Sequence, residues 1–86
     1  MLQKHVNMPP KTGMNAANAA ALVQLACRFR AQIHIDQGPR IINCKSMMGV
    51  LSIGASPIDS LTFSANGEDE RAALDAIEAL IRSWDA

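Results

Sequence analysis

The stretch KSMMGVLSIG, residues 45–54, contains a serine at a predicted helix start, one or two apolar turns and a glycine exit. Ser46 is a favourable N-cap residue, because its hydroxyl can accept a hydrogen bond from a backbone N–H that the first turn leaves free. The apolar residues that follow are too numerous for so short a helix to bury completely: Met47, Met48, Val50, Leu51 and Ile53. Exposed apolar side chains usually mark contact surfaces, and the flexible methionine suits that use.

Ser46 has two interpretations on this pattern. A phosphate there would lie at the positive end of the helix dipole and bring charge into the apolar patch, so the serine is a candidate switch. The simpler interpretation is a plain cap over a core helix, and spacing alone favours it.

The composition argues against several classes of protein. The 86 residues are enough for one small domain, and eight basic residues balance eight acidic ones. This balance gives no indication of binding to nucleic acid or to an anionic membrane. No apolar run approaches the roughly 20 residues of a membrane span, and the N-terminus lacks a signal-peptide pattern. We therefore expect a soluble, cytoplasmic protein.

Alternating apolar residues predict four strands, and apolar residues at helical spacing predict three helices. The expected elements are strand 2–8, helix 16–30, strands 32–36 and 40–44, the short helix after Ser46, strand 60–65 and a helix ending near Trp84. Because every strand alternates, one face of the sheet should be covered and the other wet. This predicts a single two-layer α+β domain over residues 1–86, ordered β-α-β-β-α-β-α, with the three helices together on the covered face.

This order and two local motifs together resemble the HPr family, the small phosphocarrier proteins of the bacterial phosphoenolpyruvate:sugar phosphotransferase system. Residues 45–54 are similar to that family's regulatory-serine segment nearly residue for residue. Residues 67–70, GEDE, followed by two alanines, are similar to the start of its last helix. The resemblance covers essentially the whole chain and implies an open-faced β-sandwich, in which three helices cover one face of a four-stranded antiparallel sheet.

The chain departs from the family at the start of the first helix, in GMNAANA, residues 13–19. The resemblance places Asn15 where the family has its phosphate-accepting histidine, Ala17 where it has an arginine that holds the phosphoryl group, and Asn18 where it has proline. An asparagine amide is no substitute for the imidazole nucleophile, although it still caps a helix. We therefore expect no catalytic residue, no enzyme activity and no cofactor.

The remaining candidates for chemistry have simple structural interpretations. His5 and His34 are predicted to lie on the wet face of their strands, without the spacing of a metal site. Cys27 and Cys44 fall in apolar runs, which predicts reduced, buried thiols. The charged run 68–71 is interpreted as a solvated helix end.

The resemblance implies a regulatory function in the manner of Crh-like family members, which also lack the histidine. An HPr kinase/phosphorylase-type enzyme would phosphorylate Ser46, and a catabolite-control transcription factor or phosphotransferase components would be the partners. The expected docking surface combines Met47, Met48 and Leu51 with Ala16, Ala19 and Ala20 at the first helix start. Two alternatives stay open: a phosphocarrier relay that uses another acceptor, and a diverged HPr-fold binding module.

Overall fold

The structure is a computed structural model that describes residues 1–85. Its elements are β1 (Leu2–Asn7), α1 (Ala16–Ala26), β2 (Gln32–Gln37), β3 (Arg40–Asn43), α2 (Met47–Leu51), β4 (Ser60–Asn66) and α3 (Glu70–Ser83). The predicted order β-α-β-β-α-β-α is confirmed.

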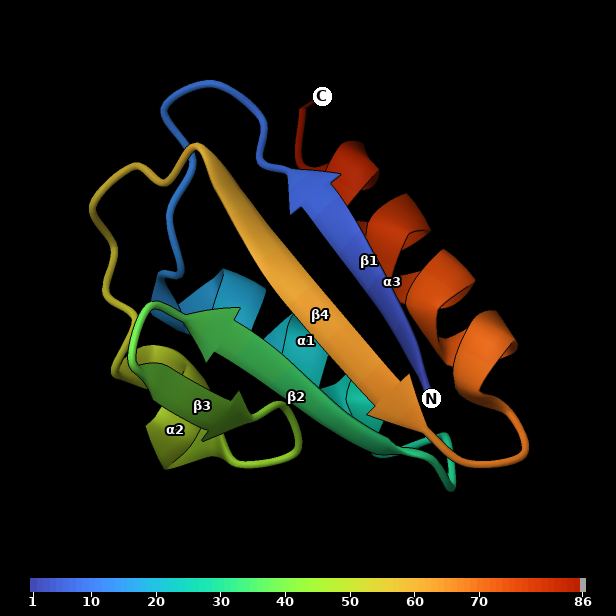
Figure 1. Ribbon diagram of the computed structural model, residues 1–86. Helices are drawn as coiled ribbons and strands as arrows, with labels where there is room; N and C mark the ends of the chain where they lie inside the picture. The colour runs from blue at the N-terminus through green and yellow to red at the C-terminus, as the bar shows by residue number, and fades with distance from the viewer. Residues whose placement is uncertain (86) are drawn as a thin grey trace.

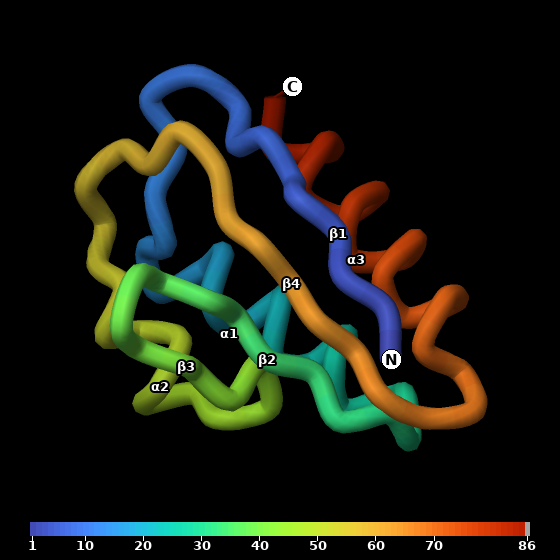
Figure 2. The backbone as a smooth tube through the Cα atoms, viewed as in Figure 1, coloured from blue at the N-terminus to red at the C-terminus, as the bar shows by residue number. Residues whose placement is uncertain are grey.

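The four strands form one antiparallel sheet in the order β1-β4-β2-β3. The long strand β4 therefore pairs with β1 on one side and with β2 on the other. All three helices lie behind the same face of this sheet, as Figure 1 shows, and the tube in Figure 2 follows the same path. The predicted two-layer α+β architecture, with three helices on one face, is confirmed.

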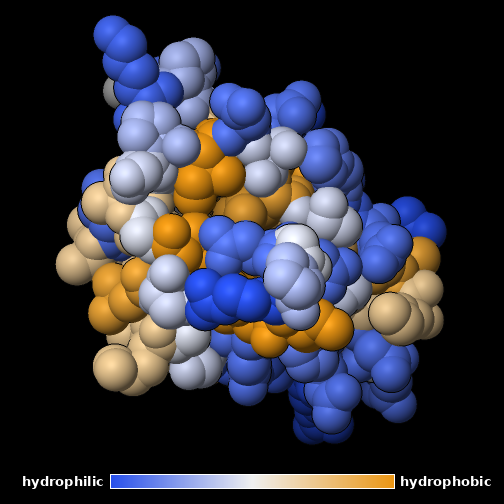
Figure 3. Space-filling view, turned by 60° about the vertical axis from the view of Figure 1, so that its left-hand side comes forward, coloured by the Kyte–Doolittle hydropathy of each residue, from blue (hydrophilic) through white to orange (hydrophobic). Residues whose placement is uncertain are grey.

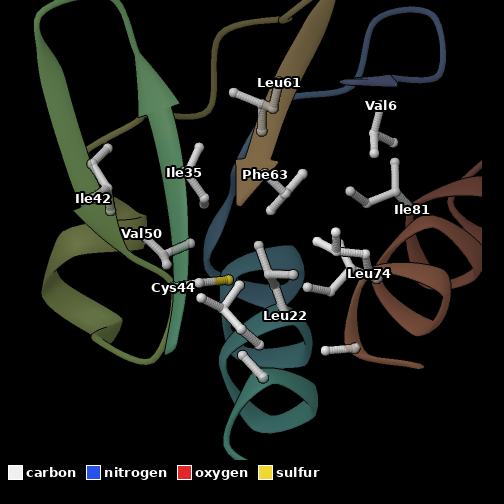
Figure 4. Close-up of a cluster of buried hydrophobic side chains, with 14 of the residues drawn as sticks. Val6, Leu22, Ile35, Ile42, Cys44, Val50, Leu61, Phe63, Leu74 and Ile81 are labelled. Carbon is white, nitrogen blue, oxygen red and sulfur yellow. The ribbon is translucent and has the colours of Figure 1, made fainter. Parts of the chain in front are cut away.

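The core lies between the sheet and the helices. Alternate side chains of the strands point into it, among them Val6, Ile35 and Phe63, and they meet Leu22 from α1 and Ile77 from α3. The close-up in Figure 4 shows several of these side chains converging from strands and helices. Alternation along the strands and helical spacing along α3 thus account for the apolar side chains in the core.

Lys4 is the one charged residue on the inward side of β1. Its ammonium forms ion pairs with Glu78, at 3.1 Å, and with Asp75, at 3.4 Å, both on α3. The hydrogen bond to Glu78 is the main cause that raises the pKa of Lys4. The lysine is tolerated there because it lies at the margin of the core, where carboxylates can reach it.

The first helix is shorter than predicted, since α1 ends at Ala26 and not at Arg30. The chain continues with hydrogen bonds between residues three positions apart. The Arg28 N–H donates to the Leu25 carbonyl at 3.0 Å, and the Phe29 N–H donates to the Ala26 carbonyl at 3.2 Å. Cys27 occupies the C-cap and is exposed, so the prediction that both cysteines are buried is wrong for this one. Cys44 is fully buried.

Candidate functional site

Ser46 is the N-cap of α2. Its backbone is extended, and its hydroxyl oxygen accepts a hydrogen bond from the Gly49 N–H at 3.1 Å. Within residues 1–85 the hydroxyl makes no bond as a donor, and the residue is half-buried. The oxygen that stabilises the helix start therefore belongs to a residue that keeps part of its surface exposed.

Gly49 lets α2 pack closely against β3. A Cβ at position 49 would lie 3.2 Å from Cγ2 of Ile42 and 3.3 Å from Oγ of Ser46. Both contacts are tight, so a larger residue would press on the buried Ile42 and on the capping oxygen. This glycine thus positions the serine.

Ser52 lies at the other end of α2, and its hydroxyl is fully engaged. It donates to the Gly49 carbonyl and accepts from a guanidinium nitrogen of Arg40. The two serines of the segment therefore differ: Ser46 has a hydroxyl proton to spare, and Ser52 has none.

The apolar side chains that follow Ser46 in α2 differ in their exposure. Met48 is 80% exposed and Leu51 is 37% exposed, while Met47 is half-buried against the core and Val50 lies within it. Figure 3 shows one face of the molecule, on which polar groups separate the apolar ones, so that they form no continuous patch. The expectation that this short helix leaves apolar side chains exposed is confirmed.

The start of α1 is closed by its own side chains. Asn15 Oδ1 accepts from the Asn18 N–H at 2.8 Å, and Asn18 Nδ2 donates to the Gly13 carbonyl at 3.0 Å. The prediction that Asn15 caps the first helix is confirmed. Its side-chain oxygen satisfies a first-turn N–H that would otherwise be free to bind an anion.

The alanines near this helix start do not share one surface. Ala16 and Ala17 are exposed and Ala20 is half-buried, but Ala19 has no exposed area. The expectation that Ala19 belongs to a docking surface is therefore wrong, because its position in the helical repeat turns it toward the core. Ala16 and Ala20 are on α1, which packs against α2.

Lys45, next to Ser46, is half-buried. Its ammonium donates to the backbone carbonyl of Phe29 at 2.7 Å, in the turn between α1 and β2. This location just beyond the carboxyl end of α1 suits a positive charge. The contact ties the Ser46 segment to the end of α1.

Asp69 holds the same turn from the other side. Its carboxylate accepts from the N–H of Arg30 at 2.8 Å and from that of Ala31 at 2.9 Å. The bond from Arg30 is the main cause that lowers the pKa of this carboxyl, partial burial opposes it, and the charge of Lys45 lowers it further. The interpretation of residues 68–71 as a merely solvated helix end is wrong for Asp69.

The neighbouring Glu70 supports the start of α3. Its side chain accepts from the Gly67 N–H at 3.1 Å and pairs with the N-terminal ammonium at 3.2 Å. These two contacts, the hydrogen bond first, lower the pKa of Glu70. Acidic residues at this helix start therefore act through specific contacts as well as through the dipole.

The two histidines lie on the open face of the sheet, outward of the core residues in their strands. His5 Nδ1 is 3.0 Å from Thr62 Oγ1, and His34 is paired with Ser64 across the strands. Within residues 1–85 no group of three or more His, Cys, Asp or Glu side chains is arranged to hold a metal ion. No helix in that part of the chain has the length and apolar character needed to cross a membrane.

These features define a small open-faced sandwich protein, with a capped serine at α2 and a closed cap at α1. Residues 2–83 match the family described as the PTS HPr component phosphorylation site. The chain belongs to the HPr family.

Relatives and solved structures agree with this assignment. The chain is 37% identical over 82 residues to the HPr-like protein Crh of Bacillus subtilis, covering 95% of this chain and 96% of the relative. It is also 37% identical, over 81 residues, to the phosphocarrier protein HPr of Cupriavidus necator, covering 94% and 91%. The crystal structure of HPr-C-His from Thermoanaerobacter tengcongensis superposes with a TM-score of 0.89 at 36% identity, covering 99% and 96%.

Proposed function

We propose that this chain is an HPr-like regulatory protein of the phosphoenolpyruvate:sugar phosphotransferase system. It is controlled by phosphorylation at Ser46 and acts through protein–protein contacts in catabolite regulation, without phosphoryl transfer through histidine. The observation that carries the proposal is the Ser46 hydroxyl, which caps α2 and donates to no group within residues 1–85, two positions before the 80% exposed Met48.

A phosphate on Ser46 suits this location for two reasons. It keeps the serine oxygen as an ester and adds three acceptor oxygens near the Gly49 N–H, so the fold tolerates it. It also places about −1.5 to −2 charge beside Met48 and Leu51, which changes what this surface binds. A partner that buries these two side chains against acidic or apolar groups is repelled, and one that offers arginines is recruited.

The proposal excludes phosphoryl transfer through a histidine because of the residues at the start of α1. Asn15 takes the place that the family resemblance assigns to the phosphocarrier histidine, and Ala17 takes the place of the phosphate-binding arginine. The amide of Asn15 is already used as a cap at 2.8 Å, and Ala17 offers no charge. Neither residue supplies a nucleophile or a phosphate partner.

The partners follow from this assignment. An HPr kinase/phosphorylase-type enzyme adds and removes the phosphate, and a catabolite-control transcription factor or phosphotransferase components respond to it. The Bacillus subtilis relative Crh is known as the catabolite repression HPr, which supports a role of this kind. The docking surface we propose is Met47, Met48 and Leu51 of α2 with Ala16 and Ala20 of α1.

A phosphocarrier relay through another acceptor is the second candidate. The observation in its favour is that the phosphocarrier protein HPr of Cupriavidus necator and Crh of Bacillus subtilis are equally similar to this chain, at 37% identity each. A diverged binding module without either role is the third.

A two-arm phosphorylation assay separates these functions. In one arm the protein is incubated with ATP and an HPr kinase/phosphorylase, and in the other with phosphoenolpyruvate and the first enzyme of the phosphotransferase system. We expect one acid-stable phosphate in the first arm and none in the second. Acid-labile phosphate in the second arm supports the relay, and no phosphate in either arm supports the binding module.

A further inference from the structure

The peptide group between Phe29 and Arg30 is held at both ends by opposite charges. Its carbonyl accepts from the Lys45 ammonium at 2.7 Å, and its N–H donates to the Asp69 carboxylate at 2.8 Å. The three parts come from the β3–α2 connection, the α1–β2 turn and the N-cap of α3.

The two hydrogen bonds strengthen each other. A cation on the carbonyl draws electrons through the peptide group and makes its N–H a better donor. The carboxylate on the N–H in turn makes the carbonyl a better acceptor, and both bonds are charge-assisted. The charge of Lys45 also contributes to the lowered pKa of Asp69, which agrees with an electrostatic link between the two residues.

The turn that carries this peptide group has little room to move. A Cβ on Gly67 would lie 2.6 Å from the Ala31 Cα, so the chain before α3 runs directly against the turn. The second oxygen of Asp69 is bound by the Ala31 N–H at 2.9 Å. If the hydrogen bond from Lys45 to the Phe29 carbonyl is lost, the turn therefore stays in place. The hydrogen bond that changes is the one from the Arg30 N–H to Asp69.

We propose that Lys45 and the Phe29–Arg30 peptide group transmit a charge placed on Ser46 to Asp69 at the start of α3. The transmission rests on the proposed function of Ser46. A phosphate on the adjacent residue competes with the Phe29 carbonyl for the Lys45 ammonium. The carbonyl then loses its cationic donor, and the Arg30 N–H becomes a weaker donor to Asp69.

Amide exchange and proton chemical shifts, measured by NMR, test this link. The phosphoserine is incorporated at position 46 during chain synthesis, so that no kinase is needed. We expect the Arg30 amide to exchange about fivefold faster with the phosphate than without it. A change of this size corresponds to about the net free energy of one ordinary hydrogen bond. Its proton resonance should move upfield. The Ala31 amide, which belongs to the next peptide group, should change less.

Variants at Lys45 identify the transmitting group. Lys45→Met should show the fast Arg30 exchange without phosphate, and the phosphate should add little to it. Lys45→Arg keeps a cationic donor and should retain the response. Lys11→Met removes the same charge from an exposed lysine. Its Arg30 amide should respond to the phosphate as it does in the chain without substitutions.

Two results would overturn the proposal. One is an Arg30 amide in the phosphoserine protein whose exchange and shift are unchanged. The other is an equally large phosphate response in Lys45→Met. Because the phosphate is built into the chain, the failure of a kinase to modify Ser46 counts against the proposed function and leaves this measurement intact.

Discussion

The hydroxyl oxygen of Ser46 accepts from the Gly49 N–H at 3.1 Å, and the same oxygen is the one that a kinase would modify. The stability of α2 and the proposed modification of the protein therefore depend on a single atom. A residue that can cap α2 but has no hydroxyl group, such as aspartate, separates helix stability from phosphorylation.

Substitutions of Ser46 test the cap. Ser46→Ala should lower the free energy of unfolding by about 0.5–2 kcal/mol, because the Gly49 N–H loses its acceptor. Ser46→Asp should stay close to the unchanged protein, since aspartate is an equally good N-cap. Urea unfolding measures both, with Ser56→Ala in the exposed loop as the control. An aspartate variant as unstable as the alanine variant would contradict the capping role.

Substitutions of Asn15 test how far the fold depends on the residue that caps α1. Asn15→Ala should cost about 0.5–2 kcal/mol, because the Asn18 N–H loses its side-chain acceptor. Asn15→His should remain folded and give a circular dichroism spectrum like that of the unchanged chain. Collapse of the histidine variant would show that the amide does more than cap α1.

Asp69 should make stability depend on pH in the acid range. Its pKa is lower in the folded state than in the unfolded chain, so its contribution is present above the ordinary carboxyl pKa and is lost as pH falls through the folded value. The difference in unfolding free energy between the unchanged protein and Asp69→Asn should therefore be constant near neutral pH and shrink on acidification. Asp59→Asn, an exposed site, matches the charge change. A difference that does not vary with pH would contradict this account.

The two cysteines should differ in reactivity. Burial raises the pKa of the Cys44 thiol to about 12, whereas Cys27 is exposed at the C-cap of α1. Iodoacetamide at mildly alkaline pH should add one group to the folded protein, at Cys27, and two groups in urea. Intact mass and peptide mapping measure this. Rapid labelling of Cys44 in the folded protein would show that the core around it opens.

Sequence patterns predicted the local features of this fold because their causes are local. Alternation predicted the buried apolar side chains of β2 and β4, although it did not predict that Ser64 is buried too. Helix-start chemistry predicted the caps Asn15 and Ser46. The end of α1 was predicted too late, because the polar groups of the following turn are satisfied by distant side chains. Ala19 was placed on the surface because alanine is small enough for either environment.

The contacts around the site could not be read from the sequence. Lys45 reaches a carbonyl 16 residues away, and Asp69 reaches N–H groups 38 and 39 residues away. Neither spacing corresponds to a period of a helix or a strand, so only the packed structure brings these groups together. Likewise, the contact between Ser52 and Arg40 joins residues 12 positions apart and could not be read from the local sequence.

Site-resolved mass spectrometry after incubation with ATP and an HPr kinase/phosphorylase tests the central claim most directly. The account predicts one phosphate on Ser46 in the unchanged chain and in Ser52→Ala, and none in Ser46→Ala. Phosphate that remains after Ser46→Ala, or that maps to Ser52 or Ser56, would contradict it.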